Sequence, residues 1–181
     1  MVIANVDTAN PAGGRGDSKV HTVSIASWAR EATTTIYTAL DVIGNDAAES
    51  AVIEFPGAGT SGVVNYVTIA HEETKVITPR LFVFDAAPTD ILDNAALALV
   101  SSDLAKLVAV YEFAESDKIN VGTGLEVYIP SVSVGGGNVD LAHASAYNTT
   151  TGSLYGLLQT VTGYTPTASI KTTIRLQLEV T

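Results

Sequence analysis

The chain has 181 residues, enough for one domain with a sizeable core. Hydrophobic residues make up 46% of it and charged residues only 15%, which excludes disorder of the whole chain. The net charge of −10 repels phosphate backbones and anionic lipid, so we expect neither a nucleic-acid partner nor a membrane.

The apolar content is rich in β-branched residues, which are stiff and favour strands over helices. Val, Ile and Thr recur throughout, and six prolines and 15 glycines supply turns. Cysteine is absent, so the fold is expected to hold by packing alone. The composition predicts an all-β protein.

Residues 1–18 have the character of a flexible N-terminal arm. Residues 10–17 combine chain breakers with small and charged residues and show no hydrophobic period. We expect this arm to order only against a neighbour, and residues 19–181 to form a single β-sandwich domain. The start of the chain lacks the basic and apolar stretches of a secretory signal, so synthesis in the cytoplasm is expected.

From about residue 20, short apolar runs alternate with turn signals. Strands are predicted, in chain order, at residues 21–25, 32–37, 51–55, 63–71 and 76–84. Residues 44–46 and 56–62 mark turns between them. Residues 81–84 are apolar on both faces, which is typical of a central strand of a sandwich.

Residues 90–108 fit no single period. Leu92, Ala96 and Leu99 follow helical spacing, and Ser102 with Asp103 suits the cap of a short helix at residues 104–107. We predict a loop with this one helical turn and a strand that starts near Val108.

Later strands are predicted at residues 108–113, 124–134, 154–161 and 173–180, with a flexible loop at 135–138 and a turn at 163–167. In the last strand Ile174, Leu176 and Leu178 alternate with polar residues, so one face is buried. About eight to ten strands at this spacing predict a single β-sandwich, jelly-roll-like in its topology.

No pattern in the sequence supports catalysis, so we expect no enzyme, no catalytic residue and no cofactor. His21, His71 and His143 are far apart in the sequence, and no nucleophile elbow accompanies them. The glycine-rich segments at residues 13–17 and 122–124 do not continue as phosphate loops. The tripeptide Arg15-Gly16-Asp17 spells an integrin-binding motif but is short enough to arise by chance.

The carboxylates Asp85, Asp90, Asp93 and Asp103 crowd one region of the sequence. One alternative is a site for a hard cation such as Ca²⁺, which takes oxygen ligands. The other is turn chemistry, because Asp beside Asn, Pro and Thr bonds local backbone groups. The spacing matches no EF-hand loop, so we favour turn chemistry and expect no metal site.

Blocks of sequence at residues 37–44 (YTALDVIG), 81–89 (LFVFDAAPT, followed by DNAA at 93–96 and Asp103) and 154–158 (LYGLL, followed by YTP at 164–166) stand out. Together they resemble a family of phage-encoded virion structural proteins. The residues in these blocks are expected to shape turns, with Asp85 and Asp93 bonding backbone N–H groups and Gly44 adopting a positive φ.

The resemblance implies a particle component, made in the host cytoplasm and located on the capsid exterior. The function expected from it is capsid decoration, that is, stabilising the head by bridging capsomers. The expected partners are the major capsid protein and further copies of this chain, as a dimer or trimer. The alternative is a tail or fibre component involved in host adhesion, although one tryptophan and 7% aromatic residues offer little for carbohydrate stacking.

Overall fold

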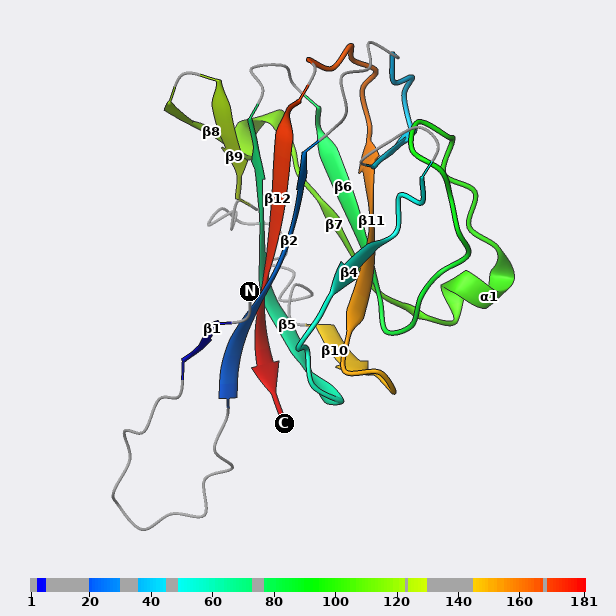
Figure 1. Cartoon of the computed structure of the whole chain (residues 1–181), viewed down its shortest axis with the longest axis vertical. Helices are drawn as coiled ribbons and strands as arrows, with labels where there is room; N and C mark the ends of the chain where they lie inside the picture. The colour runs from blue at the N-terminus through cyan, green and yellow to red at the C-terminus, as the bar shows by residue number, and fades with distance from the viewer. Residues whose placement is uncertain are drawn as a thin grey trace, which may run out of the picture.

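The computed structural model describes residues 3–5, 20–29, 36–44, 49–72, 77–122, 124–129, 145–167 and 169–181. They form two antiparallel β-sheets packed on each other (Figure 1). Helix in this part of the chain is confined to α1 (Ser101–Leu104) and the short 3-10 helix η1 (Glu115–Asp117). The all-β class expected from the composition and the sandwich expected from the strand spacing are confirmed.

The larger sheet has seven strands in the order β1-β2-β12-β5-β9-β8, with β10 also paired to β5. Its strands are β1 (Ile3–Asn5), β2 (Val20–Ala29), β5 (Ser61–His71), β8 (Lys118–Gly122), β9 (Leu125–Tyr128), β10 (Ser145–Asn148) and β12 (Lys171–Val180). One edge of β5 pairs with β12, and the opposite edge is shared between β10 near its start and β9 near its end.

The smaller sheet has five strands in the order β3-β11-β6-β7, with β4 also paired to β11. They are β3 (Val42–Ile43), β4 (Ile53–Phe55), β6 (Pro79–Phe84), β7 (Leu107–Glu112) and β11 (Leu154–Thr160). Because β3 and β4 lie along the same edge of β11, they act as one interrupted strand.

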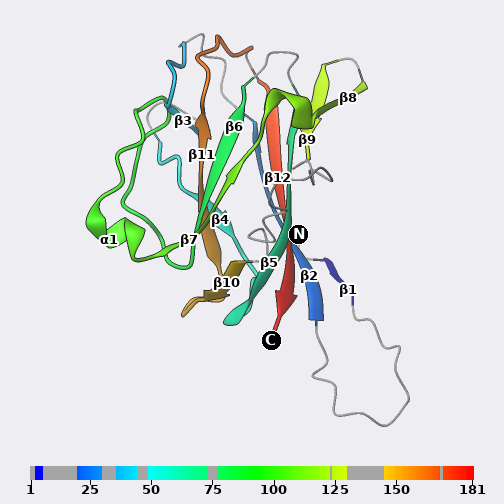
Figure 2. The same cartoon turned by 180° about the vertical axis from the view of Figure 1, so that it is seen from behind.

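The strand pairs are nested along the chain. β2 pairs with β12, β3 and β4 with β11, β5 with β10, and β6 with β7. The β8–β9 hairpin is inserted between the innermost pair and β10. The two sheets therefore contain mostly contacts between residues far apart in sequence. The first and last described strands, β1 and β12, both lie in the larger sheet (Figure 2).

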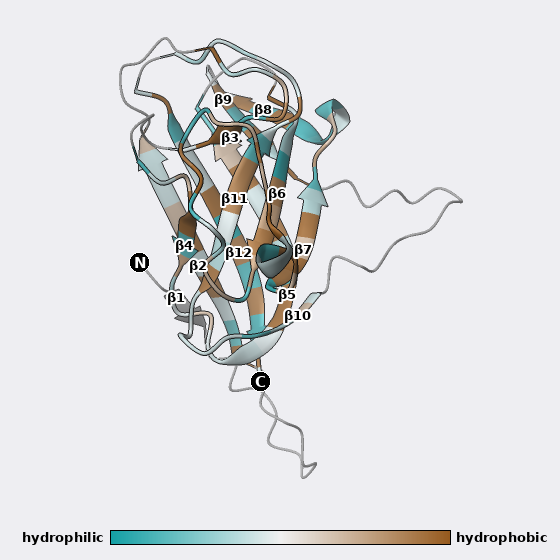
Figure 3. Cartoon of the chain, turned by 90° about the vertical axis from the view of Figure 1, so that its right-hand side faces the viewer, coloured by the Kyte–Doolittle hydropathy of each residue, from teal (hydrophilic) through white to brown (hydrophobic). Residues whose placement is uncertain are grey.

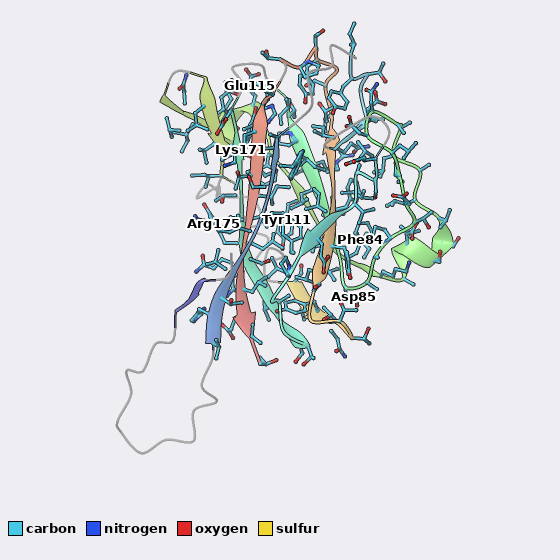
Figure 4. The ribbon with its side chains drawn as sticks, in the orientation of Figure 1. Phe84, Asp85, Tyr111, Glu115, Lys171 and Arg175 are labelled. Carbon is cyan, nitrogen blue, oxygen red and sulfur yellow. The ribbon has the colours of Figure 1, made fainter. Side chains whose placement is uncertain are left out.

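The main core lies between the two sheets. β12 contributes Ile174, Leu176 and Leu178, all 0% exposed, while Arg175 and Gln177 point to solvent, as the alternation predicted. Tyr111 of β7 also belongs to this core, and Figure 4 places its side chain between the sheets.

A second core lies on the other face of the smaller sheet. Residues 85–106, which join β6 to β7 and are called here the covering segment, cross that face (Figure 3). In β6, Leu81 and Val83 enter the main core, whereas Phe82 and Phe84 enter the second. The apolar run at residues 81–84 is thus explained by burial on both faces, and the predicted central strand is confirmed.

Two predictions on local structure need correction. The predicted helix at residues 104–107 is wrong in position, because α1 ends at Leu104 and β7 already starts at Leu107. Within the predicted arm, Ile3–Asn5 form β1, paired to His21–Val23 of β2, so this part is a strand. The other residues of the arm lie outside the described part of the chain, as do residues 32–35 of one predicted strand and the predicted loop at 135–138.

None of the helices in the described ranges is long and apolar enough to cross a membrane.

Candidate functional site

Residues from all three sequence blocks of the family resemblance meet in one buried cluster: Tyr37, Gly44, Asp93 and Tyr164. Asp93 Oδ1 accepts hydrogen bonds from the Tyr37 hydroxyl at 2.5 Å and from the Gly44 N–H at 2.6 Å. Tyr37 stacks on Tyr164 with ring centroids 5.0 Å apart, and the two residues form an isolated β-bridge. These side chains are buried, so the cluster fixes loops to each other and presents no open site.

The expected backbone roles in this cluster are partly confirmed. Asp93 does bond a backbone N–H group, as predicted. The positive φ predicted for Gly44 is wrong, since this residue is absent from the described residues with positive φ. Close packing favours glycine here instead: a Cβ at this position would lie 3.0 Å from the Cβ atoms of both Ala51 and Asp93.

Asp103 holds the covering segment together. Its carboxylate accepts the Thr89 N–H at 2.8 Å, the Thr89 hydroxyl at 3.1 Å and the Val100 N–H at 3.2 Å, and Lys106 Nζ lies 3.5 Å away. Burial raises the pKa of Asp103, but the hydrogen bonds from Thr89, Val100 and Lys106 outweigh burial and leave the pKa lowered. This carboxylate, and not that of Asp85, organises the turn.

The crowded carboxylates do not form one site. Asp93 and Asp103 serve separate hydrogen-bond networks, and Asp85 lies at the base of the covering segment, next to Phe84 (Figure 4). Across the described ranges, no three His, Cys, Asp or Glu side chains approach closely enough to hold a metal ion. The absence of a metal site remains a prediction.

The histidines are equally dispersed where they are described. His71 is buried, with Nδ1 at 2.9 Å from the Thr172 hydroxyl, and His21 is exposed on β2. His143, the tripeptide Arg15-Gly16-Asp17 and the glycine-rich residues 13–17 lie outside the described residues.

An apolar surface covers the outside of the second core. Along residues 95–100 the side chains alternate: Leu97 and Leu99 pack inward, while Ala96, Ala98 and Val100 are exposed. The same segment exposes Leu92 by 47% and Leu104 by 59%. We call this set the apolar outer surface: Leu92, Ala96, Ala98, Val100 and Leu104. Sequence reasoning missed it, because the period of two at residues 95–100 was interpreted as helical spacing.

A groove of about 370 Å³ lies between β2 and the segment that leads into β4. A hydrogen bond from Ser24 Oγ to the Pro56 carbonyl (2.8 Å) spans one end, and one from Trp28 Nε1 to the Gly44 carbonyl (3.0 Å) spans the other. Its walls present polar and apolar surface in nearly equal parts, and Glu54 is their one charged side chain among the described residues. Nothing in the sequence indicated this groove, since it depends on how the two sheet edges face each other.

The β8–β9 hairpin buries a charge. Glu126 is 3% exposed and binds Lys118 Nζ at 3.1 Å and the Tyr128 hydroxyl at 3.2 Å. Burial, reinforced by Glu126, raises the pKa of Tyr128, so this phenol stays protonated. The inward face of the hairpin is therefore polar, and its apolar residues Ile119 and Val121 are about half exposed, at 49% and 54%.

Comparison with known proteins finds no matching family model and no matching curated protein.

Proposed function

We propose that this chain is a structural protein of a bacteriophage particle, a capsid decoration protein that stabilises the head by bridging capsomers. The observation that carries the proposal is the apolar outer surface, which is built on an ordered layer of the fold.

The topology supports a structural role of this kind. The nested pairing of β2 with β12, β3 and β4 with β11, β5 with β10, and β6 with β7 is the order expected of a jelly roll, which we propose as the finer description of the sandwich. Jelly rolls serve in viral capsids, and also in lectins and cupins. Topology alone therefore does not choose a function, and the choice has to come from the surfaces.

The apolar outer surface is suited to a protein partner. Val100 and Leu104 are exposed by 47% and 59%, whereas Leu97 and Leu99 of the same segment pack against the second core. Large apolar side chains that are exposed on an ordered segment, and that recur along it, are consistent with an interaction site. The hydrogen bonds to Asp103 hold this segment in one conformation, so little ordering entropy is lost on contact.

Such a protein stabilises a particle by mass action. If it binds the assembled lattice and not the free capsid subunit, each bound copy shifts the equilibrium toward the intact shell. A contact that is chiefly apolar and β-edge in character survives high salt, unlike one held by charges that ions screen. We also propose that the chain associates with itself as a dimer or trimer, because lattice positions have twofold or threefold symmetry.

The experiment is to strip the protein from particles, add it back at low salt and at about 1 M salt, where the screening length is about 3 Å, and measure particle survival on heating. We expect rebinding at both salt concentrations and greater survival with the protein present. Particles that are equally robust without it would refute the decoration role, and rebinding that fails only at high salt would refute the apolar contact.

Matched variants locate the contact. Val100→Glu with Leu104→Glu places charges on the apolar outer surface and should abolish rebinding, while thermal stability stays close to that of the wild type because both side chains are exposed. Ile119→Glu with Val121→Glu places the same charges on the β8–β9 hairpin and should leave rebinding intact. Copy number separates the alternative role, since hundreds per particle fit decoration and a few dozen or fewer fit a tail or fibre component.

A further inference from the structure

The groove beside β2 contains a strand edge that has no partner strand among the described residues. β1 pairs with His21–Val23 only, and from Ser24 to Ala29 β2 pairs, within the described chain, with β12 alone. Every second residue of such a strand directs its N–H and C=O away from its single partner. These groups form a ready template for one more strand.

We propose that this edge takes up a single extended segment of a partner protein, with small apolar side chains and one lysine or arginine, as an added strand. The hydrogen bonds at Ser24 and Trp28 mark a length of about five residues, or about 13 Å at the rise of a β-strand. The volume of about 370 Å³ suits side chains of moderate size.

The walls of the groove define the chemistry of the segment. Ile25, Val52 and Ile53 line it, so alternate side chains that point inward are expected to be apolar. Glu54 is exposed, and one of its carboxylate oxygens accepts the Ser153 hydroxyl at 2.8 Å. No basic residue of the described chain lines the groove, so a cation carried by the partner would be the complement of Glu54.

The same geometry disfavours a second copy of the sandwich as the occupant. The β4 side is tied to β2 across both ends of the groove, and the edge of another sheet would have to reach β2 past both ties. A lone extended segment needs only the spacing of about 4.8 Å between neighbouring strands. The groove would act in this way whichever protein supplies the segment, in a particle or elsewhere.

The test uses blocked synthetic peptides and amide NMR shifts of the full chain. The probe is Val-Thr-Val-Thr-Lys, titrated to about 10 mM because affinities near 1 mM are expected for so few contacts. We expect shifts at the amides of Ile25 to Trp28. A peptide with proline in place of both threonines should cause none, because proline lacks the N–H that pairs with the edge.

Charge reversal tests the role of Glu54. Replacing the peptide lysine with glutamate should weaken binding about two- to fivefold, the range for an exposed ion pair, and Glu54→Lys should reverse that order. Glu72→Lys makes the same charge change at an exposed site after β5 and should leave the order of the two peptide affinities unchanged.

Three outcomes would overturn the inference. These are no shift at Ile25 to Trp28 with any peptide, equal shifts from the proline peptide, or shifts at these amides that follow protein concentration without peptide, which would identify a second copy as the occupant. Particle rebinding is measured for Glu54→Lys as well, which keeps the two proposals apart. A protein that binds the peptide but does not bind particles contradicts only the capsid role. A protein that binds particles but does not bind the peptide contradicts only the groove as a binding site.

Discussion

Removing one hydroxyl from the buried cluster at Tyr37 should destabilise the whole protein. Tyr37→Phe deletes the hydrogen bond to Asp93 Oδ1 (2.5 Å) and retains a ring that can stack on Tyr164. Asp93 keeps the bond from the Gly44 N–H at 2.6 Å, so its carboxylate loses the Tyr37 donor but not the backbone donor.

The expected loss follows from the type of bond. A hydrogen bond to a charged group contributes about 1.5–3 kcal/mol to stability, and the carboxylate here is only 4% exposed, so water replaces the lost donor poorly. We expect a loss of about 2 kcal/mol in the free energy of unfolding. For a chain of this length that equals a fall of about 4–8 °C in Tm.

The assay is urea unfolding together with a thermal scan, with Tyr155→Phe as the control. Tyr155 is half-buried over the second core, and its hydroxyl has no hydrogen-bond partner among the described residues, so its loss should change stability by less than about 0.5 kcal/mol. A double-mutant cycle with Asp93→Asn should show a coupling of at least about 0.5 kcal/mol. Equal effects of the two tyrosine variants, or no coupling, would refute the assigned role of the cluster.

Other perturbations test the rest of the fold. Gly156→Ala would place a Cβ 2.8 Å from Phe55 Cε2 and should cost about 1–3 kcal/mol in urea unfolding, whereas Gly122→Ala, with no atom within 4 Å, should be nearly neutral. Because the pKa of Asp103 is lowered in the folded protein, its contribution to stability is fully present above the ordinary value of 3.8 and is lost as pH falls through the folded value. The curves of unfolding free energy against pH for wild type and Asp103→Asn should therefore converge only below about pH 3.8. Convergence near neutral pH would contradict this. EDTA should shift Tm by less than about 2 °C, and a large fall that Ca²⁺ reverses would reveal a site. Deleting residues 1–18 removes β1 from the edge of β2 and should leave Tm nearly unchanged, so a far lower Tm would show that the arm supports the core.

Much of the architecture was predictable because burial leaves its period in the sequence. The alternation in β12 predicted a strand with one buried face, and the continuous apolar run in β6 predicted a central strand. Successive side chains of a strand point to opposite faces, so the pattern records what covers each face. Glycine and proline placed most of the turns for the same local reason.

Residues 90–108 were harder, because two local signals competed. Leu92, Ala96 and Leu99 satisfy helical spacing, yet residues 95–100 form no helix, and Leu97 and Leu99 pack against the second core. Asp103 suited a helix cap by its position in the sequence, but it is the third residue of α1. Its carboxylate accepts hydrogen bonds from the N–H groups of Val100 and Thr89. Packing against the sheet outweighed the weak local preference.

By itself the sequence determined the class of fold, the faces of the long strands and the sparse charge of the surface, since each depends on residue type and on spacing along the chain. Tertiary structure alone decided where Asp93, Tyr37 and Gly44 meet, which faces of residues 95–100 stay exposed, and how the edges of β2 and β4 enclose the groove. Those features join residues that are tens of positions apart in the chain, and no local period records which distant segments will lie side by side.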